Sequence, residues 1–182
     1  MKAVFLDRDG TLIHDRPGHY LSRPEDMRVY KGAPEALAKL SARGFKLFIV
    51  SNQSGIGRGY FSRAAAVRIN RRLEKILAAA GAEITETAFC PHSPQDGCPC
   101  RKPSPEMGKR LVKKYKIDVA ASFMVGDKLI DAEFGKRLGV RTVMLGTGHG
   151  ASQAAKSGVK PDHRARNIIS AVNWILKNEI QD

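Results

Sequence analysis

Two carboxylates stand two residues apart near the start of the chain, in the stretch Asp7-Arg-Asp-Gly-Thr11. Acids this close repel one another unless a cation joins them. Mg²⁺ prefers oxygen ligands and typically takes one or two carboxylates together with substrate phosphates. Taken alone, the segment could also be an acidic turn that caps the next element. Three later groups favour phosphoryl chemistry: the hydroxyls and amides of Ser51-Asn-Gln-Ser-Gly55, the cation Lys102 and the carboxylate Asp127.

The cysteines of the chain, Cys90, Cys98 and Cys100, lie in one short segment together with His92. A Cys₃His set fits a closed tetrahedral Zn²⁺ site, which has no vacancy for substrate or water. The alternatives are three free thiols beside a surface histidine, or a disulfide, for which a cytosolic protein of this size has little use. Two basic residues follow the last cysteine directly. A metal here would therefore order the loop that aims cations at a substrate, which is a structural role.

Length and composition predict one soluble domain. The chain has 182 residues, of which 42% are hydrophobic and 27% are charged. This length is sufficient for a core of its own, and no repeat or linker divides residues 1–182. The chain has no apolar run of membrane-spanning length, and its N-terminal stretch Met1-Lys-Ala-Val-Phe-Leu-Asp7 reaches a charged residue too soon to supply the apolar region of a secretory signal. We therefore expect a cytoplasmic protein that does not enter a membrane.

The net charge is +13, which favours a polyanionic partner or a substrate with several phosphates. Much of the charge lies in residues 63–75 and 101–116, where apolar residues recur at helical spacing. In the first segment, Val67, Leu73, Ile76 and Leu77 are predicted to face inward, and the basic residues to form a solvated face. Aromatic residues make up only 7% of the chain, so platforms for stacking single-stranded nucleic acid are scarce. We expect no nucleic-acid partner, although a nucleic-acid 3′-phosphatase or binding protein stays as an alternative.

The elements alternate between strands and helices. Apolar runs predict strands over 3–6, 46–50, 85–89, 122–125 and 141–145, and periodicity and capping predict helices over 34–42, 132–138 and 167–176. Ser62 is the expected N-cap of another helix, which Gly81 ends, and Ser104-Pro-Glu106 is expected to open a further one. This order predicts a mainly parallel α/β sheet covered on both faces, with its site at the carboxyl ends of the strands.

The polar segments, in this order at successive strand ends, resemble the haloacid dehalogenase (HAD) superfamily of phosphotransferases. The resemblance implies a Rossmann-like parallel sheet with helices on both faces, no large cap domain and one zinc-binding loop at 90–103. In that family the first aspartate attacks phosphorus, the second is the acid and base, and a serine and a lysine hold the phosphoryl oxygens. These roles fall on Asp7, Asp9, Ser51 and Lys102. A Mg²⁺ site is implied at Asp7, Asp9 and Asp127, and structural Zn²⁺ at Cys90, His92, Cys98 and Cys100.

The narrower resemblance is to the sugar-bisphosphate phosphatases of the histidinol-phosphate phosphatase-like subgroup that act on D-glycero-D-manno-heptose 1,7-bisphosphate. It rests on Asp7-Arg-Asp-Gly-Thr-Leu, Ser51-Asn-Gln-Ser-Gly-Ile-Gly-Arg-Gly59, Cys-Pro-His, Cys-Arg-Lys-Pro and Met124-Val-Gly-Asp-Lys-Leu. It implies a monomer that removes the 7-phosphate through an aspartyl phosphate and supplies heptose 1-phosphate for heptose nucleotide and lipopolysaccharide or cell-surface glycan synthesis. The residues implied to contact this small phosphorylated sugar are Asp15, His19, Tyr20, Ser51, Asn52, Gln53, Ser54, Arg101 and Lys128.

Histidinol phosphate is the alternative substrate, because the loop between His92 and Cys98 is as short as in the histidinol-phosphate phosphatases. The ammonium and imidazole of that substrate would prefer acids at the mouth of the site. The loop 93–97 has one acid, Asp96, whereas Arg16, Arg58 and Arg101 lie in or beside segments expected near the entrance. A bisphosphate is therefore favoured. His14, His149 and His163 show no ligand spacing and are expected at the surface or in loops, while His19 and Tyr20 are implied to lie over the site.

Overall fold

The computed structural model describes residues 1–16, 18–153 and 158–179; the last residues of the predicted domain, 180–182, lie outside them. Six strands form one sheet in the order β3-β2-β1-β4-β5-β6, and every neighbouring pair is parallel. The strands are β1 (Ala3–Leu6), β2 (Lys46–Asn52), β3 (Ile84–Cys90), β4 (Phe123–Gly126), β5 (Arg141–Leu145) and β6 (His163–Ala165). The parallel sheet predicted from the sequence is confirmed.

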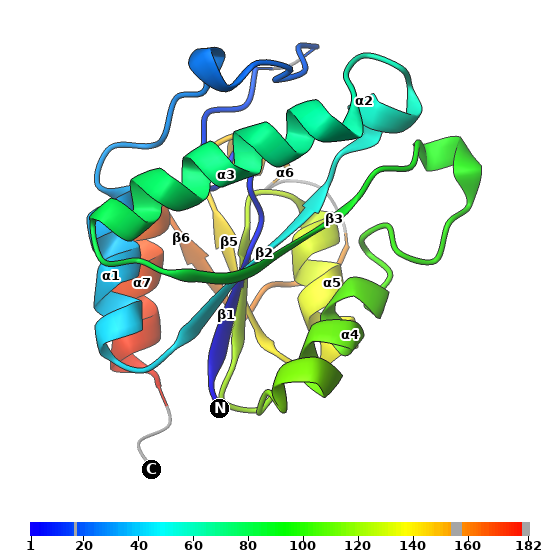
Figure 1. The fold of residues 1–182 in the computed structure, drawn as a ribbon. Coiled ribbons are helices and arrows are strands. Elements are labelled where there is room, and N and C mark those ends of the chain that lie inside the picture. Colours follow the sequence, from blue (N-terminus) through cyan, green and yellow to red (C-terminus); the bar gives the residue numbers. More distant parts are fainter. Residues whose placement is uncertain (17, 154–157, 180–182) are drawn as a thin grey trace.

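Helices cover both faces of the sheet (Figure 1). The longer ones are α1 (Ala33–Ala42), α3 (Arg63–Ala79), α4 (Glu106–Tyr115), α5 (Leu129–Leu138) and α7 (Ile168–Lys177), and the short ones are α2 (Ser54–Gly57) and α6 (Gly150–Gln153). Two 3₁₀ turns span Pro24–Asp26 and Pro94–Asp96. No helix in the described ranges is long and apolar enough to cross a membrane.

The core divides into two layers because side chains alternate across each strand. On one face, Val4 and Leu6 of β1 pack with residues of α1, α3 and α7. On the other face, Ala3 and Phe5 pack with residues of α4 and α5. Strand β1 lies between β2 and β4. The chain therefore passes from β1 to strands on one side of it, and later returns to form the strands on its other side. Such a reversal of strand order is where open α/β sheets bind ligands.

Several local predictions are corrected by the structure. Strand β6 was not predicted, and the helix expected to open at Ser104 begins at Glu106, with Pro105 at its N-cap and no side-chain cap. The N-cap at Ser62 is confirmed, since its Oγ accepts a hydrogen bond from the main-chain N of Ala65 at 3.1 Å. Val67 is only partly buried. Small residues before it fill the buried face of α3 instead, at Ala65 and Ala66.

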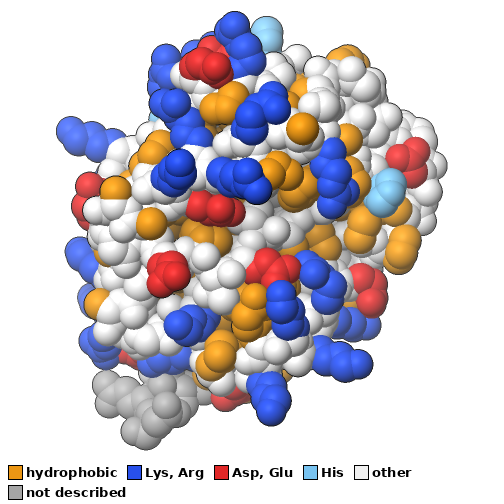
Figure 2. Space-filling model, viewed as in Figure 1, with side chains coloured by type: hydrophobic (Ala, Val, Ile, Leu, Met, Phe, Trp, Pro, Cys, Tyr) orange, Lys and Arg blue, Asp and Glu red, His pale blue; other side chains and the backbone are white. Residues whose placement is uncertain are grey.

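The basic residues of α3 lie on its outer side. Arg68, Arg71, Arg72 and Lys75 are exposed, and no ion pair to any of them is found among the described residues. Figure 2 shows Lys and Arg side chains spread over this face with apolar and acidic side chains between them. This distribution fits a solvated helix face, as the sequence predicts.

Candidate active site

The first predicted acid lies at the centre of the sheet. Asp7 follows β1 directly, and its main-chain N donates to the carbonyl of Val125 at the end of β4. The residue is only 5% exposed. Lys102 reaches it from the segment after the cysteines, and its Nζ donates to Asp7 Oδ1, Asp131 Oδ1 and the carbonyl of Val50, each at 2.7 Å. A buried ammonium with all three donors satisfied is held in one place.

Three buried acids meet around this lysine. Oxygens of Asp7, Asp127 and Asp131 lie within 4.8 Å of one another. Burial raises the pKa of Asp7 to about 6, although Lys102 opposes the shift. Burial, followed by the charge of Asp7, raises the pKa of Asp127 to about 7. The cluster therefore has more carboxylates than Lys102 neutralises, which is the situation that an added cation relieves.

Asp131 connects Lys102 to the start of helix α5. Its Oδ1 accepts from Lys102 and its Oδ2 accepts from the main-chain N of Lys128, at the start of α5. Both oxygens are therefore engaged, and Asp131 positions Lys102. The sequence analysis did not name Asp131 as a site residue. Its spacing of four from Asp127 shows only that both lie near the start of one helix.

The main chain approaches Asp127 closely on two sides. A Cβ built at Gly10, where φ is +88°, or at Gly148, where φ is +55°, would lie 2.3 Å from Asp127 Oδ2. Glycine is therefore required at both positions for space as well as for conformation. The main-chain N of His149 donates to the same oxygen at 2.7 Å. The loops after β1 and β5 thus enclose Asp127, and from the first of them the Thr11 hydroxyl donates to Asp127 Oδ1 at 3.5 Å.

The second predicted acid is held apart from this cluster. Arg8 Nη2 donates to Asp9 Oδ1 at 3.1 Å, while Arg8 Nε and Gln53 Nε2 donate to Asp9 Oδ2 at 3.1 and 2.7 Å. Of the expected Mg²⁺ set, the side chains of Asp7 and Asp127 lie in the cluster with Asp131, whereas the carboxylate of Asp9 is bonded to Arg8 and Gln53. Burial alone would raise the pKa of Asp9, but Arg8 and the Gln53 hydrogen bond lower it below its usual value.

Arg8 is a buried cation that the sequence analysis passed over. It is 1% exposed, and it also donates to Asn70 Oδ1 on α3 at 2.7 Å and to Gln53 Oε1 at 2.8 Å. Its position between two aspartates in the sequence gave no indication that its side chain points into the protein. Asn70 is one of the residues that α3 buries, and it fixes the guanidinium that holds Asp9.

The segment after β2 mainly positions other groups. Gln53 Nε2 donates to Ser51 Oγ at 2.7 Å as well as to Asp9. Asn52 exchanges two 3.0 Å hydrogen bonds with the main chain of Lys102. The amide groups of Asn52 and Gln53 are therefore engaged within the protein, although both residues line the pocket described next. Ser54 also lines that pocket, at the start of α2.

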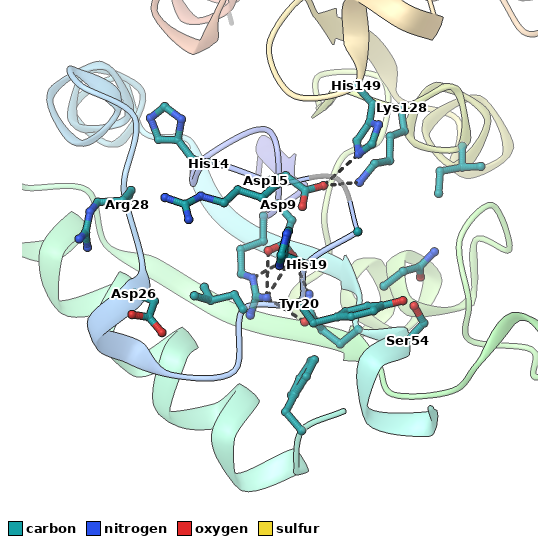
Figure 3. A pocket seen from close by; sticks show the side chains of 18 of the residues that line it. Asp9, His14, Asp15, His19, Tyr20, Asp26, Arg28, Ser54, Lys128 and His149 are labelled. Carbon is teal, nitrogen blue, oxygen red and sulfur yellow. Dashed lines mark hydrogen bonds and ion pairs between the residues drawn. The ribbon is translucent and has the colours of Figure 1, made fainter. Parts of the chain in front are cut away.

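A pocket of about 1060 Å³ opens beside these residues (Figure 3). Its wall includes Asp9, Asp15, His19, Tyr20, Arg101 and Lys128, all of them predicted site residues, and also Arg16, Arg28, His14 and His149. His14 and His149 lie in loops, as expected, and both also line the pocket, which the sequence analysis did not anticipate. Arg58 and Asp96 are absent from its described wall. Burial would lower the pKa of Lys128, but Asp7, Asp127 and Asp15 raise it above its usual value.

The four predicted zinc ligands converge. Cys90 Sγ lies 3.4 Å from Cys98 Sγ and 3.6 Å from His92 Nδ1, and Cys100 Sγ lies 3.3 Å from His92 Nδ1 and 3.6 Å from Cys98 Sγ. These separations exceed a disulfide bond of about 2.05 Å. They are close to the edge of roughly 3.8 Å that bonds of about 2.3 Å give in a tetrahedron. Arg101 follows the cluster, and its Nη1 donates to the carbonyl of His92 at 3.4 Å.

Comparison with known proteins decides the family. A family model described as HAD-hydrolase-like matches residues 99–171. The D-glycero-beta-D-manno-heptose-1,7-bisphosphate 7-phosphatase of Bordetella bronchiseptica is 32% identical over 179 residues, which cover 98% of this chain and 99% of that protein. The chain belongs to the heptose-1,7-bisphosphate 7-phosphatase family.

Other members of the heptose-1,7-bisphosphate 7-phosphatase family agree with this assignment. The D-glycero-D-manno-heptose-1,7-bisphosphate 7-phosphatase of Chlorobaculum tepidum is 35% identical and covers 96% of this chain and 94% of its own. The crystal structure of the B. bronchiseptica phosphatase, complexed with magnesium and phosphate, superposes with a TM-score of 0.91 at 30% identity, covering 97% and 99% of the two chains. The HAD-like fold expected from the sequence is confirmed.

Proposed function

We propose that the chain removes the 7-phosphate of D-glycero-D-manno-heptose 1,7-bisphosphate by two successive displacements at phosphorus. Family membership supports the substrate, and one geometric observation supports the chemistry. The carboxylate of Asp7 is held at a strand end by a buried lysine that touches it at 2.7 Å. A carboxylate fixed in this way can attack a phosphoryl group whose negative charge the same lysine offsets.

In the first displacement, a carboxylate oxygen of Asp7 bonds to phosphorus as the bond from phosphorus to the sugar oxygen breaks. Asp9 gives its proton to the departing alkoxide. In the second, Asp9 takes a proton from water, whose oxygen attacks phosphorus and releases inorganic phosphate and free Asp7. Before substrate binds, Arg8 and Gln53 keep Asp9 ionised, so Asp9 takes up from solvent the proton that it later donates. A substrate phosphate beside Asp9 raises its pKa by like-charge repulsion, which is the direction that a general acid needs.

The acid cluster suits Mg²⁺, and Asp7 and Asp127 are the residues we propose to hold it. Asp131 is instead assigned to positioning Lys102, because its two oxygens accept from Lys102 and from the main-chain N of Lys128. The carboxylate of Asp9 is engaged by Arg8 and Gln53, so a ligand from Asp9 would be its main-chain carbonyl. When bound, the ion supplies positive charge that stabilises the transferring phosphoryl group.

The cysteine cluster suits Zn²⁺ in a structural role. Four ligand atoms fill a tetrahedral set, so no position is left for a substrate. Burial raises the pKa of Cys90 to about 12, and a thiolate there needs a cation beside it. We propose that the zinc orders the loop from which Arg101 and Lys102 reach the site. Three free thiols in one short segment also suit a reducing compartment, and we place the reaction in the cytoplasm.

A bisphosphate suits the pocket better than histidinol phosphate. Four permanent cations line the described wall, Arg16, Arg28, Arg101 and Lys128, in addition to the buried Arg8. Asp26 and Asp15 also line it, but Arg23 pairs with the first and Lys128 with the second. We propose that the chain acts as a monomer on this small sugar phosphate, with no nucleic-acid or membrane partner. The product, heptose 1-phosphate, would supply the synthesis of heptose nucleotides and cell-surface glycans.

Phosphate release from a substrate panel tests the proposal. The panel contains both anomers of heptose 1,7-bisphosphate, histidinol phosphate, fructose 1,6-bisphosphate and a 3′-phosphorylated oligonucleotide. We expect kcat/KM for one heptose bisphosphate anomer to exceed that for histidinol phosphate at least about a hundredfold, or roughly 2.7 kcal/mol of differential transition-state binding. A preference for histidinol phosphate or for the oligonucleotide would overturn the substrate assignment.

A further inference from the structure

His149 is fixed beside the acid cluster by its main chain. Its N–H donates to Asp127 Oδ2 at 2.7 Å. The turn has little freedom, because a Cβ at Gly148 would meet Asp127 and one at Gly150 would lie 1.7 Å from the carbonyl oxygen of Leu145. Thr147 on the same turn donates its hydroxyl to the carbonyl of Gly10 at 2.7 Å. His149 is thus the one residue between Gly146 and Gly150 whose side chain lines the pocket.

The imidazole points from this turn toward the loop after β1 (Figure 3). His149 Nε2 and Lys128 Nζ both lie 3.2 Å from the same oxygen of Asp15. The three residues come from three separate segments and are each partly exposed, with 33% of the His149 side chain accessible. Within the described residues, Asp15 Oδ1 has no hydrogen-bond partner. The pocket wall therefore presents two donors and an unused acceptor close together.

We infer that His149 is a substrate-binding residue that recognises the hydroxyl groups of the sugar chain next to the reacting phosphate. This inference rests on the proposed function and assigns part of its specificity. Because the main chain of His149 touches Asp127, its ring can reach only the portion of a substrate close to Asp7. A hydroxyl both donates and accepts, so it can pair with His149 or Lys128 and with Asp15 at once.

The alternative is that His149 only holds the loop of Asp15 in place. The 3.2 Å contacts of His149 and Lys128 with Asp15 are longer than the usual 2.7–2.9 Å of charge-assisted hydrogen bonds, so they hold the loop weakly. A site built to hydrogen-bond a hydroxyl discriminates strongly against an analogue that lacks it, because its polar groups are then left unpaired. The two roles therefore predict different responses to removal of substrate hydroxyls.

The test compares glycerol 3-phosphate with propyl phosphate, which has the same carbon chain and phosphate but no hydroxyls. We expect the parent to prefer glycerol 3-phosphate at least tenfold in kcat/KM. His149→Ala should reduce this preference to within about threefold of unity, mainly by loss of activity on glycerol 3-phosphate. His149→Gln, which keeps an N–H donor, should restore much of it. The matched control is His163→Gln, which changes a histidine of β6 that lies outside the described pocket wall. It should leave the preference unchanged.

Equal losses on both phosphates in His149→Ala would show that the residue only supports the loop and would overturn the inference. A parent with no preference for the hydroxylated phosphate would overturn it as well. The heptose assignment is tested separately by the substrate panel. A chain that ignores heptose bisphosphate but shows the His149-dependent preference would refute the proposed substrate while supporting the role of His149.

Discussion

The reacting centre and the pocket rim are built in different ways. At the centre, the side chain of Lys102 is 1% exposed and makes three contacts of 2.7 Å. At the rim, Asp15, Lys128 and His149 meet at 3.2 Å and are partly exposed. Groups that transfer a phosphoryl group gain from being fixed in a dry site, whereas groups that recognise a sugar must exchange their partners for the substrate. The comparison indicates that chemistry and substrate choice are separable here.

An aromatic contact completes the rim. Tyr20 stacks on Tyr60 with ring centroids 4.8 Å apart and lies 6.2 Å from Phe61. Tyr60 is 59% exposed, which is unusual for a large ring. A Cβ at Gly55 would lie 2.2 Å from Phe61 and 2.7 Å from Tyr20. The loop that covers the pocket thus rests on the turn before α3 at one end and on Lys128 and His149 at the other.

The largest expected effect is at the centre. Asp7→Asn should lower kcat at least about a thousandfold on every phosphate ester, because an amide does not attack phosphorus but occupies nearly the same volume. Steady-state kinetics would measure it, with unfolding followed by circular dichroism to show that the fold is kept. Turnover within tenfold of the parent, after mass spectrometry has excluded deamidation, would remove Asp7 from this role.

The second effect is on stability. Asp131→Ala should lower the free energy of unfolding by about 3 kcal/mol, since it removes one partner of a buried ion pair. Relief of repulsion with Asp7 and Asp127 offsets part of the cost. Urea titration would measure the loss. The control on the same helix is Glu133→Ala, which removes an exposed pair with Arg137 and should cost less than about 1 kcal/mol. Similar losses in both variants would contradict the account of Lys102.

The third prediction concerns pH and magnesium. The folded-state pKa values, about 6 for Asp7 and about 7 for Asp127, lie above those of the unfolded chain. Their contribution to the stability of the metal-free protein is therefore fully present below about pH 4 and is lost as pH rises through the folded values. Mg²⁺ binds the ionised groups, so it should raise Tm by about 4 °C more at pH 8 than at pH 5.

Asp127→Asn is the control for that measurement, because it removes one of the two acids while keeping the shape of the site. The variant should lose most of the Mg²⁺-induced rise in Tm at pH 8. An equal rise in Tm at both pH values in the parent would mean that Mg²⁺ binds elsewhere.

The fourth prediction concerns zinc. Elemental analysis should find one tightly held zinc per chain. Cys98→Ser should weaken its retention and lower kcat/KM about tenfold, because the loop that places Arg101 and Lys102 loses its order. Full activity of the zinc-free protein with Mg²⁺ supplied would contradict this structural role.

The sequence predicted the features that depend on residues close together along the chain. Strands β1, β2, β4 and β5 each contain an apolar run that is buried on both faces, so composition identifies them. Strand β6 has three residues, of which only Ala165 is buried, and no pattern marks it. Asp7 and Lys102 could be predicted because each lies in a distinctive motif.

The missed site residues depend on contacts between distant parts of the chain. Arg8 and Asn70 are 62 residues apart, and His149 and Asp15 are 134 apart. No spacing rule relates such positions. His149 stands between two glycines in a loop and lacks metal-ligand spacing, so its place in the pocket follows only from the fold. Residues that support the reacting groups and a residue that lines the pocket were therefore missed for the same reason.

The most direct test of the separation between chemistry and recognition is Arg101→Ala, assayed on heptose 1,7-bisphosphate, histidinol phosphate and p-nitrophenyl phosphate. Arg101 lines the pocket, and its guanidinium can hold phosphate oxygens in a bidentate manner. The account predicts that the preference for heptose bisphosphate over histidinol phosphate falls about tenfold, while kcat on p-nitrophenyl phosphate stays within about threefold of the parent. An unchanged preference, or an equal loss on all three substrates, would contradict it.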